Sequence, residues 1–527
     1  MAIYWQSRMG NNPDGIGGNC HRYDFVDKGG TTALVVDFGI KIHNGEGDYR
    51  CSFPDPDGLF AKRDDPVDGG KDGKSTADAL LLTHCHEDHI GALRHAIDMG
   101  YRLPPIHCTA FTAQMLDKSL TRAGIIDPAQ RPEVHVVDPG ETVRVKNARA
   151  TFVPVDHLPG ASALLLHNDE TAIFHTGDYK FDSTMTLGSG ADMAQLRGIG
   201  CHGVDMVVSD STAAGDEAGK ISEAEIERNL CKIVADQKDR AIIAGILGTQ
   251  LDRLVSLGRA AKANDRSVII TGTSLCENVK AAERSGISFE KAIGAPLLTP
   301  AEAKGITADK ALVVTTGAFA QPQAGLMRAA ETLPGALYVD RETTILIPQR
   351  AIPPVAEAHR EMIGRLEKLG ARVISAENAP GLGYGAIHQS GHAIAADTRL
   401  LYSLLQPKRC VSPIHGAPGQ ISANAAIVRQ LGIEPLELPH NGSKVRVDRD
   451  GVQIVGTESL ARIAAAETGQ LKQLPRAKAG EGRRPPPPPI HRYDRLDERG
   501  EKMKARDVSP YAGPVRRPPR TAVERGR

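Results

Sequence analysis

A short histidine-rich stretch places the strongest constraint on this chain. It reads Leu80-Leu-Leu-Thr-His84-Cys-His86-Glu-Asp88-His89-Ile-Gly, so three histidines and an aspartate follow an apolar run that predicts a buried strand. A loop that leaves the end of a strand can turn all four side chains toward one point. Imidazole nitrogens together with a carboxylate suit a borderline transition metal such as zinc. The stretch therefore predicts a metal site, and a polar loop that is merely rich in histidine is the alternative.

Three more candidate ligands lie far from this stretch in the sequence but share its position just after a predicted strand. They are His157 after Ala150–Val155, Asp178 after Ala172–Phe174 and His415 after Cys410–Ile414. A loop at the end of each strand could reach the same edge of a sheet. A hydrolytic metal site keeps some coordination positions for water and substrate, so a few protein ligands per ion are enough. The combined set predicts metal-assisted hydrolysis, whereas any one of these residues alone would be an ordinary structural side chain.

The composition is typical of a multidomain cytoplasmic protein. With 527 residues the chain is long enough for two or three domains with ample buried cores. Its eight cysteines are scattered without a Cys-x-x-Cys pair, which suits a reducing cytosol better than a disulfide framework. The first residues lack the pattern of a signal peptide, and no apolar stretch approaches the ~20 residues that a membrane helix needs. We expect a cytoplasmic protein without a membrane partner.

The formal net charge of zero hides a strongly basic C-terminus. Residues 471–527 contain sixteen Lys or Arg and seven Asp or Glu, so the rest of the chain carries a net charge of −9. The segment also contains the proline run Pro485 to Pro489 and very few branched aliphatic residues. Because it cannot bury enough apolar surface to offset its ordering entropy, we expect a disordered tail. Its charge favours contact with nucleic acid as much as its composition favours a solvated tail without a partner.

The remaining sequence divides into regions with different patterns. From about 31 to 212 the apolar runs are mainly short strands, separated by Gly, Pro and Asp. From about 220 to 370 strands and helices alternate, as in Ala241–Leu247 and the helical pattern at 250–263. This alternation predicts a largely parallel sheet flanked by helices. After it come a helical pattern, the strand Cys410–Ile414 and a second helical pattern.

Taken together, the motifs resemble a known family. The order Thr-His-x-His-x-Asp-His-Ile-Gly, then a single histidine, then His-Thr-Gly-Asp is similar to the metallo-β-lactamase fold. Ser209-Asp210-Ser-Thr, His388-Gln-Ser-Gly-His392 and Pro-Ile-His415-Gly resemble motifs A, B and C of its β-CASP nucleic-acid-processing branch. Within that branch the chain is most similar to bacterial ribonuclease J. The 177 residues between Asp210 and His388 match the inserted β-CASP domain, which small-molecule hydrolases of the fold lack.

The resemblance covers about residues 12–450 and implies an α/β architecture. The expected fold is an αββα metallo-β-lactamase sandwich, with an inserted β-CASP α/β domain and a disordered basic C-terminal tail. The expected domains are the first part of the sandwich at 1–215, the β-CASP domain at 216–370, the returning part of the sandwich at 371–455 and the tail at 456–527.

The resemblance also implies roles for individual residues. It implies two Zn²⁺ per chain, with Mn²⁺ as the alternative metal: one ion at His84, His86 and His157, the other at Asp88, His89 and His415, with Asp178 bridging both. The resemblance implies that Asp210 and His392 transfer protons and contact the scissile phosphate. The alternative for Asp210 is a purely structural N-cap or turn residue. The substrate phosphate is expected at His388, Gln389, Ser390, Gly391 and His392. Asp37 is expected to support a metal ligand rather than to bind metal.

Three features depart from the ribonuclease J pattern. Where that family usually reads Gly-Ser-Gln-Gly-Glu-Pro, this chain has Gly317-Ala-Phe-Ala-Gln-Pro322. The acidic residue that usually follows the motif C His-Gly is Ala417 here, and the basic tail replaces the usual folded C-terminal domain. These departures concern exonuclease mode, 5′-end sensing and family-type oligomerisation, and they leave the expected metal ligands intact.

The resemblance implies a zinc-dependent ribonuclease that hydrolyses phosphodiester bonds of single-stranded RNA, by 5′–3′ exonucleolytic or endonucleolytic cleavage, with a water activated by two metals. It leaves room for a homo-oligomer or an RNA-decay complex. One alternative is a DNA-acting β-CASP nuclease, but His415 argues against it, because DNA-acting eukaryotic relatives tend to have valine at motif C. The other alternative is a non-catalytic RNA-binding β-CASP protein, but inactive relatives usually lose ligands, and all seven candidates are present here.

Overall fold

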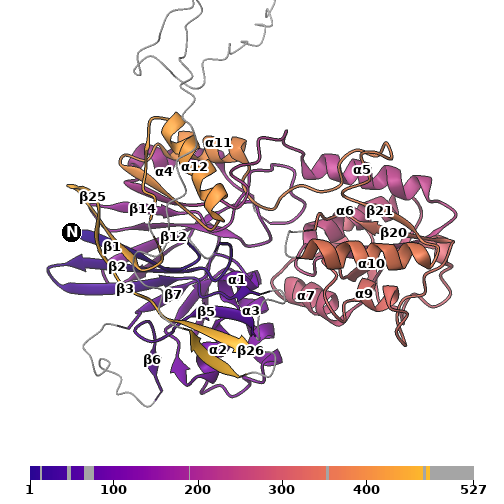
Figure 1. Cartoon of the computed structure of the whole chain (residues 1–527), viewed down its shortest axis with the longest axis horizontal. Helices are drawn as coiled ribbons and strands as arrows, with labels where there is room; N and C mark the ends of the chain where they lie inside the picture. Colours follow the sequence, from indigo (N-terminus) through magenta and orange to yellow (C-terminus); the bar gives the residue numbers. More distant parts are fainter. Residues whose placement is uncertain are drawn as a thin grey trace, which may run out of the picture. The chain divides into compact units, whose positions relative to one another are not determined.

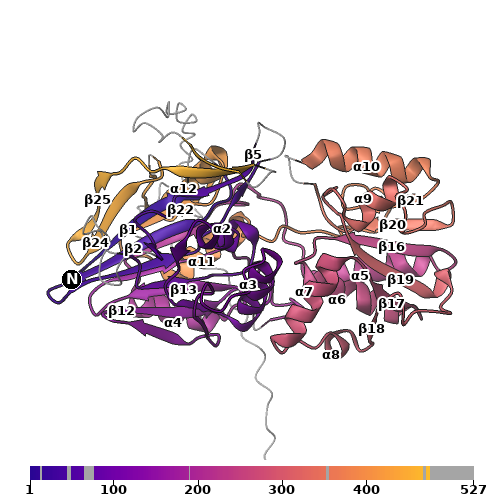
Figure 2. The same ribbon diagram turned by 90° about the horizontal axis from the view of Figure 1, so that it is seen from below.

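The structure is a computed structural model, and the residues that it describes are 1–11, 15–43, 49–63, 76–188, 190–351, 355–438, 440–466 and 470–474. Met1–Gly482 form one compact unit, and the second unit, Arg483–Arg527, lies outside the described residues. The first unit contains two large stacked sheets and a third sheet that is entirely parallel (Figures 1 and 2).

The two large sheets are mixed, and each pairs a strand from before residue 215 with a strand from after residue 405. In order across the first sheet, the strands are β10 (Val134–Val136), β9 (Ile106–Cys108), β7 (Ala79–Leu81), β3 (Gly30–Val36), β2 (Cys20–Asp27), β1 (Ala2–Met9), β24 (Ser443–Asp448) and β25 (Gly451–Thr457). Across the second sheet they are β11 (Thr142–Val145), β12 (Ala148–Pro154), β13 (Ser162–His167), β14 (Ala172–His175), β15 (Met206–Asp210), β22 (Cys410–Ile414) and β23 (Glu434–Pro435).

The main core of the sandwich lies between these two sheets. Alternate residues of a strand point to the same face, and Tyr23 and Phe25 of β2 pack in one buried cluster with Ala150 and Phe152 of β12. The same cluster includes Trp5 of β1. The N-terminal strands are therefore structural parts of the sandwich, although the sequence pattern places its strands only from about residue 31 onward.

Helices cover the outer faces of the two sheets. The helices on the side of the first sheet are α1 (Glu87–Ile90), α2 (Leu93–Asp98) and α3 (Ala110–Arg122); those on the side of the second sheet are α4 (Met193–His202), α11 (Ala395–Leu405) and α12 (Pro418–Gln430). In Figure 1 the layers follow one another as helices, second sheet, first sheet and helices. This is the expected αββα order, and within the described residues no helix combines the length and apolarity needed to cross a bilayer.

The third sheet belongs to the expected β-CASP domain. Its parallel strands are, in order, β18 (Leu297–Leu298), β17 (Ser267–Ile270), β19 (Ala311–Thr316), β16 (Ala241–Ile246), β20 (Thr343–Ile347) and β21 (Arg372–Ser375). One face is covered by α5 (Glu223–Asp236), α6 (Leu251–Lys262), α7 (Thr273–Arg284) and α8 (Phe289–Ile293), and the other by α9 (Gly325–Ala330) and α10 (Ala356–Lys368) (Figure 2). A short 3-10 turn, η1 (Ala308–Lys310), precedes β19. The alternation of strands and helices between 220 and 370 thus gives the predicted parallel sheet.

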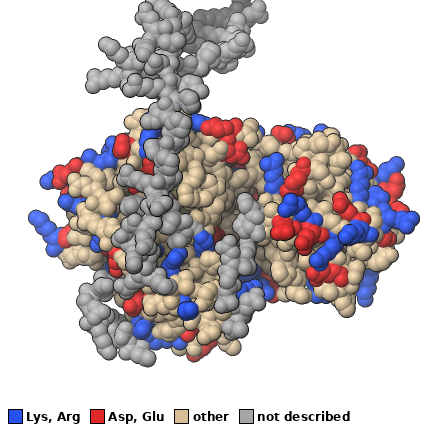
Figure 3. Space-filling model, in the orientation of Figure 1, with Lys and Arg blue, Asp and Glu red and all other residues tan. Residues whose placement is uncertain are grey.

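Burial on both faces explains why the strands of this sheet are continuously apolar. In β16, Ile242 and Ala244 pack in the cluster that contains α5 and α6, whereas Ile243 packs with α9 and α10. The outward side of α10 carries charges of both signs: Arg365 lies 3.3 Å from Glu331 and 3.8 Å from Glu361. Figure 3 shows blue and red side chains mixed over this part of the surface, as expected for a solvent-facing helix.

Two small sheets complete the described structure, and one of them corrects the expected boundary of the tail. They consist of β27 (Leu471–Leu474), β26 (Arg462–Ala466), β5 (Tyr49–Pro54) and β4 (Lys41–Ile42), and of β6 (Ala61–Lys62) and β8 (Tyr101–Arg102). Because β26 and β27 lie within 456–527, ordered strands continue beyond the position where the tail was expected to begin. Ile463 of β26 is buried and pairs with Phe53 of β5, a long-range pairing that leaves no local signal in the sequence. The rest of the expected tail, 475–527, lies outside the described residues.

Candidate active site

The candidate residues meet where strands of both large sheets end. Strands β14, β15 and β22 are parallel neighbours, so their carboxyl ends lie at one edge of the second sheet. Strands β3 and β7 are parallel neighbours in the first sheet. Just beyond the ends of β3, β7, β12, β14 and β22, respectively, lie Asp37, His84, His157, Asp178 and His415, and Asp210 is the last residue of β15. Sheet topology thus brings together the residues that the sequence places after separate strands.

A first group of four side chains could hold a metal ion. We call His84, His86, His157 and Asp178 the first ligand set; their nearest nitrogen and oxygen atoms all lie within 4.8 Å of one another. His86 Nδ1 lies 3.2 Å from His84 Nε2 and 3.1 Å from His157 Nε2. Asp178 Oδ2 lies 3.6 Å from His84 Nε2 and 3.7 Å from His157 Nε2.

The hydrogen bonds around the first ligand set suit a bound cation. The other ring nitrogens of the three histidines each face an oxygen: His84 Nδ1 lies 3.1 Å from Thr83 Oγ1, His86 Nε2 3.3 Å from Thr249 Oγ1 and His157 Nδ1 2.7 Å from the Gly391 carbonyl oxygen. A neutral imidazole that donates its N–H to such an oxygen keeps a lone pair on its other nitrogen. The three lone pairs then face the carboxylate of Asp178, which is a suitable environment for a borderline metal such as zinc.

A second group shares Asp178 with the first. The second ligand set is Asp88, His89, His415 and Asp178, again with all ligand atoms within 4.8 Å. Asp178 Oδ1 lies 3.3 Å from His89 Nε2 and 3.2 Å from His415 Nδ1, while Asp88 Oδ2 lies 3.2 Å from His415 Nε2. The two carboxylate oxygens of Asp178 therefore face different sets. All seven residues expected to bind metal lie in these two sets.

His89 is oriented by Asp37, which agrees with the supporting role expected for this aspartate. Asp37 Oδ2 lies 2.7 Å from His89 Nδ1, so this nitrogen donates and Nε2 is left for the second ligand set. Asp37 is fully buried and accepts hydrogen bonds from the Thr83 backbone N–H at 2.8 Å and from the Thr83 hydroxyl at 2.7 Å. Asn19 also lies beside His89, with its Nδ2 3.0 Å from Nε2.

The backbone that carries Asp88 and His89 packs against the segment after β3. Phe38 donates its N–H to the His89 carbonyl at 2.7 Å, and Ile40 donates to that of Glu87 at 3.0 Å. Between them, Gly39 lies so close that a Cβ atom there would be 1.7 Å from the Asp88 carbonyl oxygen. Glycine at 39 therefore permits the close approach that fixes this loop.

Asp210 and His392 form the pair expected to handle protons. His392 Nδ1 lies 2.9 Å from Asp210 Oδ2, while Asp210 Oδ1 accepts from the backbone N–H and the hydroxyl of Thr212 at 2.8 and 2.7 Å. Asp210 Oδ1 also lies 3.2 Å from His415 Nδ1, so the pair adjoins the second ligand set. Asp178, Asp210, His392 and His415 form a third group that could hold a metal, but it reuses Asp178 and His415.

Burial keeps the histidines of the first ligand set neutral. Removal from water lowers the pKa of His86 to about 4 and that of His157 to about 3, and it holds the pKa of His84 well below its usual range. A neutral imidazole is the form that binds a metal ion. These three side chains therefore need not lose a proton before they coordinate a cation.

The second ligand set has the opposite balance. Burial alone would lower the pKa of His89 and His415, but the Asp178 carboxylate and other nearby carboxylates outweigh it and raise both well above the usual value. Burial would raise the pKa of Asp178, but His415 and His89 hold it well below its usual range. Without a cation, these imidazoles take up protons to balance the surrounding carboxylates. A metal ion at this place would replace those protons.

The segment 388–392 lies beside both sets, as expected for a phosphate-binding motif. Ser390 Oγ accepts the backbone N–H of His392 at 3.0 Å, and Gly391 presents its carbonyl to His157. Burial and the nearby Arg253 lower the pKa of His388 to about 3. Among the described residues, Gln389 Oε1 and His388 Nδ1 are buried without a hydrogen-bond partner. The geometry leaves polar atoms available here, and the substrate roles of 388–392 stay a prediction.

A buried charged cluster connects this segment with the β-CASP helices. Glu223 at the start of α5 lies 2.9 Å from Lys180 Nζ and 2.9 Å from Arg253 Nη2 of α6. Burial would raise the pKa of Glu223, but Arg253 and Lys180 outweigh it and lower it to about 2. Lys180 follows Asp178 by two residues, so the cluster ties the loop of the shared ligand to the inserted domain. No local sequence pattern marks this cluster, since its members are far apart along the chain.

Thr249 and Asn19 are further contacts that the sequence did not reveal. Thr249 is separated by 163 residues from His86, and Asn19 by 70 residues from His89. Each lies in an ordinary polar loop next to glycine, in Leu-Gly-Thr249-Gln and Gly-Gly-Asn19-Cys. No local pattern distinguishes such residues from other loop residues.

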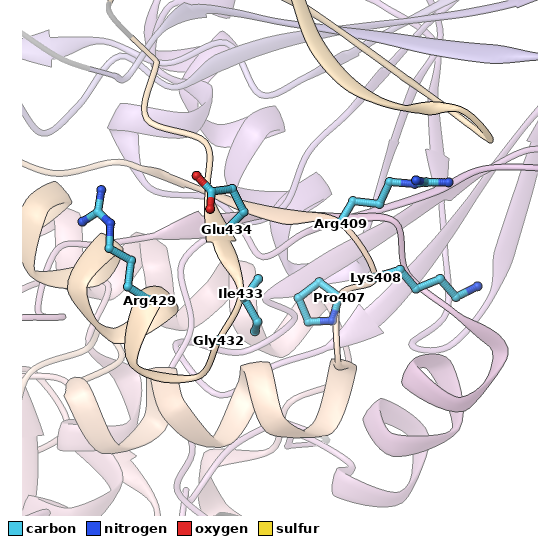
Figure 4. A pocket seen from close by; sticks show the side chains of 7 residues that line it. All are labelled: Pro407, Lys408, Arg409, Arg429, Gly432, Ile433 and Glu434. Carbon is cyan, nitrogen blue, oxygen red and sulfur yellow. The ribbon is translucent and has the colours of Figure 1, made fainter. Parts of the chain in front are cut away.

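A surface pocket of about 450 Å³ lies at the opposite end of β22 from His415, and it adds nothing to this site. Its lining residues are Pro407, Lys408, Arg409, Arg429, Gly432, Ile433 and Glu434. Figure 4 shows the side chains of Arg429 and Lys408 pointing away from one another. Arg429 pairs with Glu437, and Arg409 donates to the Arg449 carbonyl. Because the two arginines already have partners and the Lys408 side chain points away from Arg429, these cations do not converge on one anion.

Comparisons with known families agree with this architecture. A family described as "Beta-lactamase superfamily domain" matches residues 53–231, and one described as "Ribonuclease J, beta-CASP domain" matches residues 238–366. The two matched regions correspond to the first part of the sandwich and to most of the parallel-sheet domain. The combination distinguishes the chain from hydrolases that have the sandwich alone.

Individual relatives support the same assignment. The chain is 29% identical to ribonuclease J of Corynebacterium glutamicum over 427 residues, which cover 80% of this chain and 56% of that protein. It is 28% identical to ribonuclease J of Mycolicibacterium smegmatis over 389 residues, 73% of this chain and 67% of the relative. A crystal structure of a protein of unknown function from Enterococcus faecalis V583 aligns with a TM-score of 0.58 at 16% identity, over 85% of this chain and 100% of that one. The chain therefore belongs to the β-CASP branch of the metallo-β-lactamase fold and resembles bacterial ribonuclease J.

Proposed function

We propose that this protein is a metal-dependent ribonuclease of the ribonuclease J type, which hydrolyses phosphodiester bonds of single-stranded RNA. The observation that carries the proposal is the pair of ligand sets that share Asp178 and adjoin the Asp210–His392 pair. The similarity to proteins named ribonuclease J supports RNA as the substrate. Because the first of these matches spans just over half of the relative, the activity and substrate are inferred from the site together with the similarity.

We propose Zn²⁺ in both ligand sets, with Mn²⁺ as the alternative. Two bound cations would lower the pKa of a water molecule and offset the negative charge that develops on the phosphate. In this arrangement Asp178 would contribute one carboxylate oxygen to each ligand set and so fix the position of one set relative to the other. Asp37 and Thr83 fix His89 so that Nε2 keeps its direction during the reaction.

Asp210 and His392 would supply the proton transfer at the scissile bond. Burial would raise the pKa of Asp210, but His392 outweighs it and lowers it to about 2, so the carboxylate is ionised at neutral pH. Burial would lower the pKa of His392, but the nearby carboxylates of Asp210 and Asp178 outweigh this effect and raise it. A protonated His392, whose side chain is 21% exposed, can donate to a phosphate oxygen or to the leaving group.

Two other parts of the chain would contribute to RNA binding. Residues 388–392 would contact the substrate phosphate through Ser390, the Gly391 backbone and the imidazoles. The basic segment 471–527 would add sequence-independent phosphate contacts. We further propose a cytoplasmic location, a homo-oligomer or an RNA-decay complex, and exonucleolytic or endonucleolytic cleavage.

The decisive experiment combines cleavage with metal analysis. End-labelled single-stranded RNA and DNA of matched sequence are incubated with the protein, with and without a chelator, and metal content is measured by elemental analysis. We expect RNA cleavage that the chelator abolishes, and about two metal ions per chain. Asp178→Ala should lose both ions, whereas Asp138→Ala, a substitution of an exposed aspartate, should retain them.

Three results would contradict parts of the proposal. Cleavage of DNA in preference to RNA would favour the DNA-acting alternative. RNA binding without cleavage in the metal-loaded protein would favour the non-catalytic alternative. Unchanged metal content in Asp178→Ala would refute the shared-ligand assignment.

A further inference from the structure

The first ligand set depends on residues outside the first part of the sandwich. Thr249 belongs to the loop after β16 of the β-CASP domain, and its hydroxyl lies 3.3 Å from His86 Nε2. Gly391, in the returning segment, accepts from His157 Nδ1 at 2.7 Å. Two of the three histidines in this set are therefore oriented from the inserted domain and the segment that follows it.

The second ligand set is oriented differently. His89 is held by Asp37, and His415 lies against Asp210 and Thr212, and all of these residues belong to the sandwich itself. Thr249 Oγ1 is the oxygen partner that the structure gives to His86 Nε2 among the described residues. A shift of the β16 loop would consequently disturb the first ligand set and leave the hydrogen bonds of the second unchanged.

The loop that carries Thr249 is itself connected to the sandwich. Asn278 of α7 donates its amide to the carbonyl of Gly248, the residue before Thr249, at 2.8 Å. Lys118 of α3 donates to the Asn278 side chain. Arg284 of α7 donates to Gln114 of α3 at 2.8 Å, so two polar side-chain contacts join α3 and α7. This contact leads from the sandwich through Asn278 to the loop beside His86.

We propose that Thr249 is a positioning residue through which the β-CASP domain holds His86 in the geometry of the first ligand set, so that high metal affinity at this set requires the inserted domain to be docked. The proposal rests on the proposed metal-dependent function and adds that the two metal positions respond differently to the inserted domain. Thr249 acts through His86 and has no assigned contact with the substrate. Loss of such a supporting hydrogen bond typically weakens metal binding by about 10- to 100-fold.

The test is a titration of the full-length, metal-free protein with Zn²⁺ in competition with a chromophoric chelator. Thr249→Val removes the hydroxyl with little change in volume, and Thr249→Ser retains it. The matched control is Thr142→Val, which removes a hydroxyl on the exposed edge strand β11 whose partner is Thr151. Thermal unfolding of the metal-free proteins establishes that the variants are folded.

We expect Thr249→Val to weaken one of two Zn²⁺ sites by about 10- to 100-fold and to leave the other unchanged. Thr249→Ser and Thr142→Val should match the wild type. Asn278→Ala should weaken the same site, and the double variant Thr249→Val/Asn278→Ala should be no weaker than Thr249→Val alone, because both act through one contact.

Two results would overturn the inference while leaving the proposed function intact: a Thr249→Val protein with both wild-type affinities, or one that is folded and weakened equally at both sites. A wild-type protein that binds fewer than two Zn²⁺ would instead contradict the metal pair of the proposed function, and the inference would fall with it.

Discussion

His392 Nδ1 lies 2.9 Å from Oδ2 of Asp210, although 182 residues separate the two in the sequence. The contact joins the segment after the β-CASP domain to the end of β15, beside Asp178, the residue common to both ligand sets. The Asp210 carboxylate, which is ionised at neutral pH, raises the pKa of His392 and so favours the protonated imidazole. The site thus contains a candidate proton donor next to the candidate metal positions.

Asp210→Asn should reduce RNA cleavage by about 10²- to 10⁴-fold, because the neutral amide no longer keeps His392 protonated. Metal content should remain that of the wild type, since Asp210 is outside the first and second ligand sets. Single-turnover cleavage assays and elemental analysis of the same preparation test both statements. Near-normal cleavage would show that Asp210 has only a structural role in the turn at Thr212. Loss of a metal ion would identify Asp210 as a ligand.

Asp37→Asn should weaken metal binding at the second ligand set. The single amide oxygen can replace either Oδ2, which accepts from His89 and the Thr83 hydroxyl, or Oδ1, which accepts from the Thr83 backbone N–H. The amide NH2 group then faces a donor at the other position, and the side chain carries no charge. We expect about a 10- to 100-fold loss of affinity at one site, measured by chelator competition. Equal loss at both sites would indicate a general disturbance of the Thr83–His89 loop.

Gly39→Ala should damage the site through the backbone. Its new Cβ would meet the Asp88 carbonyl oxygen at 1.7 Å, so the short helix α1 that carries Asp88 and His89 must move. We expect a lower free energy of unfolding, by about 1–3 kcal/mol, together with weaker metal binding. Chemical denaturation and metal titration measure the two effects. Gly219→Ala, at a glycine outside the left-handed region with nothing within 4 Å of its added Cβ, gives a comparison for the glycine-to-alanine change itself.

Gln406→Gly should stabilise the protein by about 0.5–1 kcal/mol. Gln406 ends α11 in the left-handed conformation, with φ of 46°, and its side chain is exposed. Glycine adopts this conformation without the steric cost that a Cβ imposes. Urea unfolding should show a higher midpoint for Gln406→Gly and no gain for Gln406→Ala, which keeps the Cβ. A lower midpoint for the glycine variant would contradict the expectation.

Asp252 should make stability depend on pH. Burial raises the pKa of this carboxyl from 3.8 to about 6, above the value in the unfolded chain. The group therefore favours the folded state fully below about pH 4, and this contribution is lost as the pH rises through about 6. Asp252→Asn retains an oxygen for the Thr186 and Leu187 N–H groups and removes the titration.

The measurement compares the free energy of unfolding at about pH 4.5 and about pH 7.5, one value below and one above the pKa of the buried carboxyl. We expect the variant to lose less stability over this interval than the wild type, by roughly 1–3 kcal/mol. Asp450→Asn, at an exposed aspartate, should behave as the wild type does. An identical pH dependence in Asp252→Asn and wild type would show that the buried carboxyl does not titrate in this range.

Much of the candidate site follows from the sequence because the ligands sit directly after apolar strands. A histidine or aspartate in that position must lie at a sheet edge, and parallel neighbours such as β14, β15 and β22 share one edge. The stretch around His84 and the positions of Asp178 and His415 could therefore be predicted. The alternation of strands and helices after residue 220 likewise sufficed to predict the parallel sheet.

The tertiary structure alone decided how these ligands are oriented. Thr249 faces His86 and Gly391 faces His157 because separate parts of the chain pack together, and such contacts have no periodic pattern or motif. The same holds for β26, whose short apolar run finds its partner β5 about four hundred residues earlier and extends the ordered structure past the expected start of the tail. Local sequence determines which residues can act as ligands, whereas long-range packing determines which ring nitrogen each histidine presents.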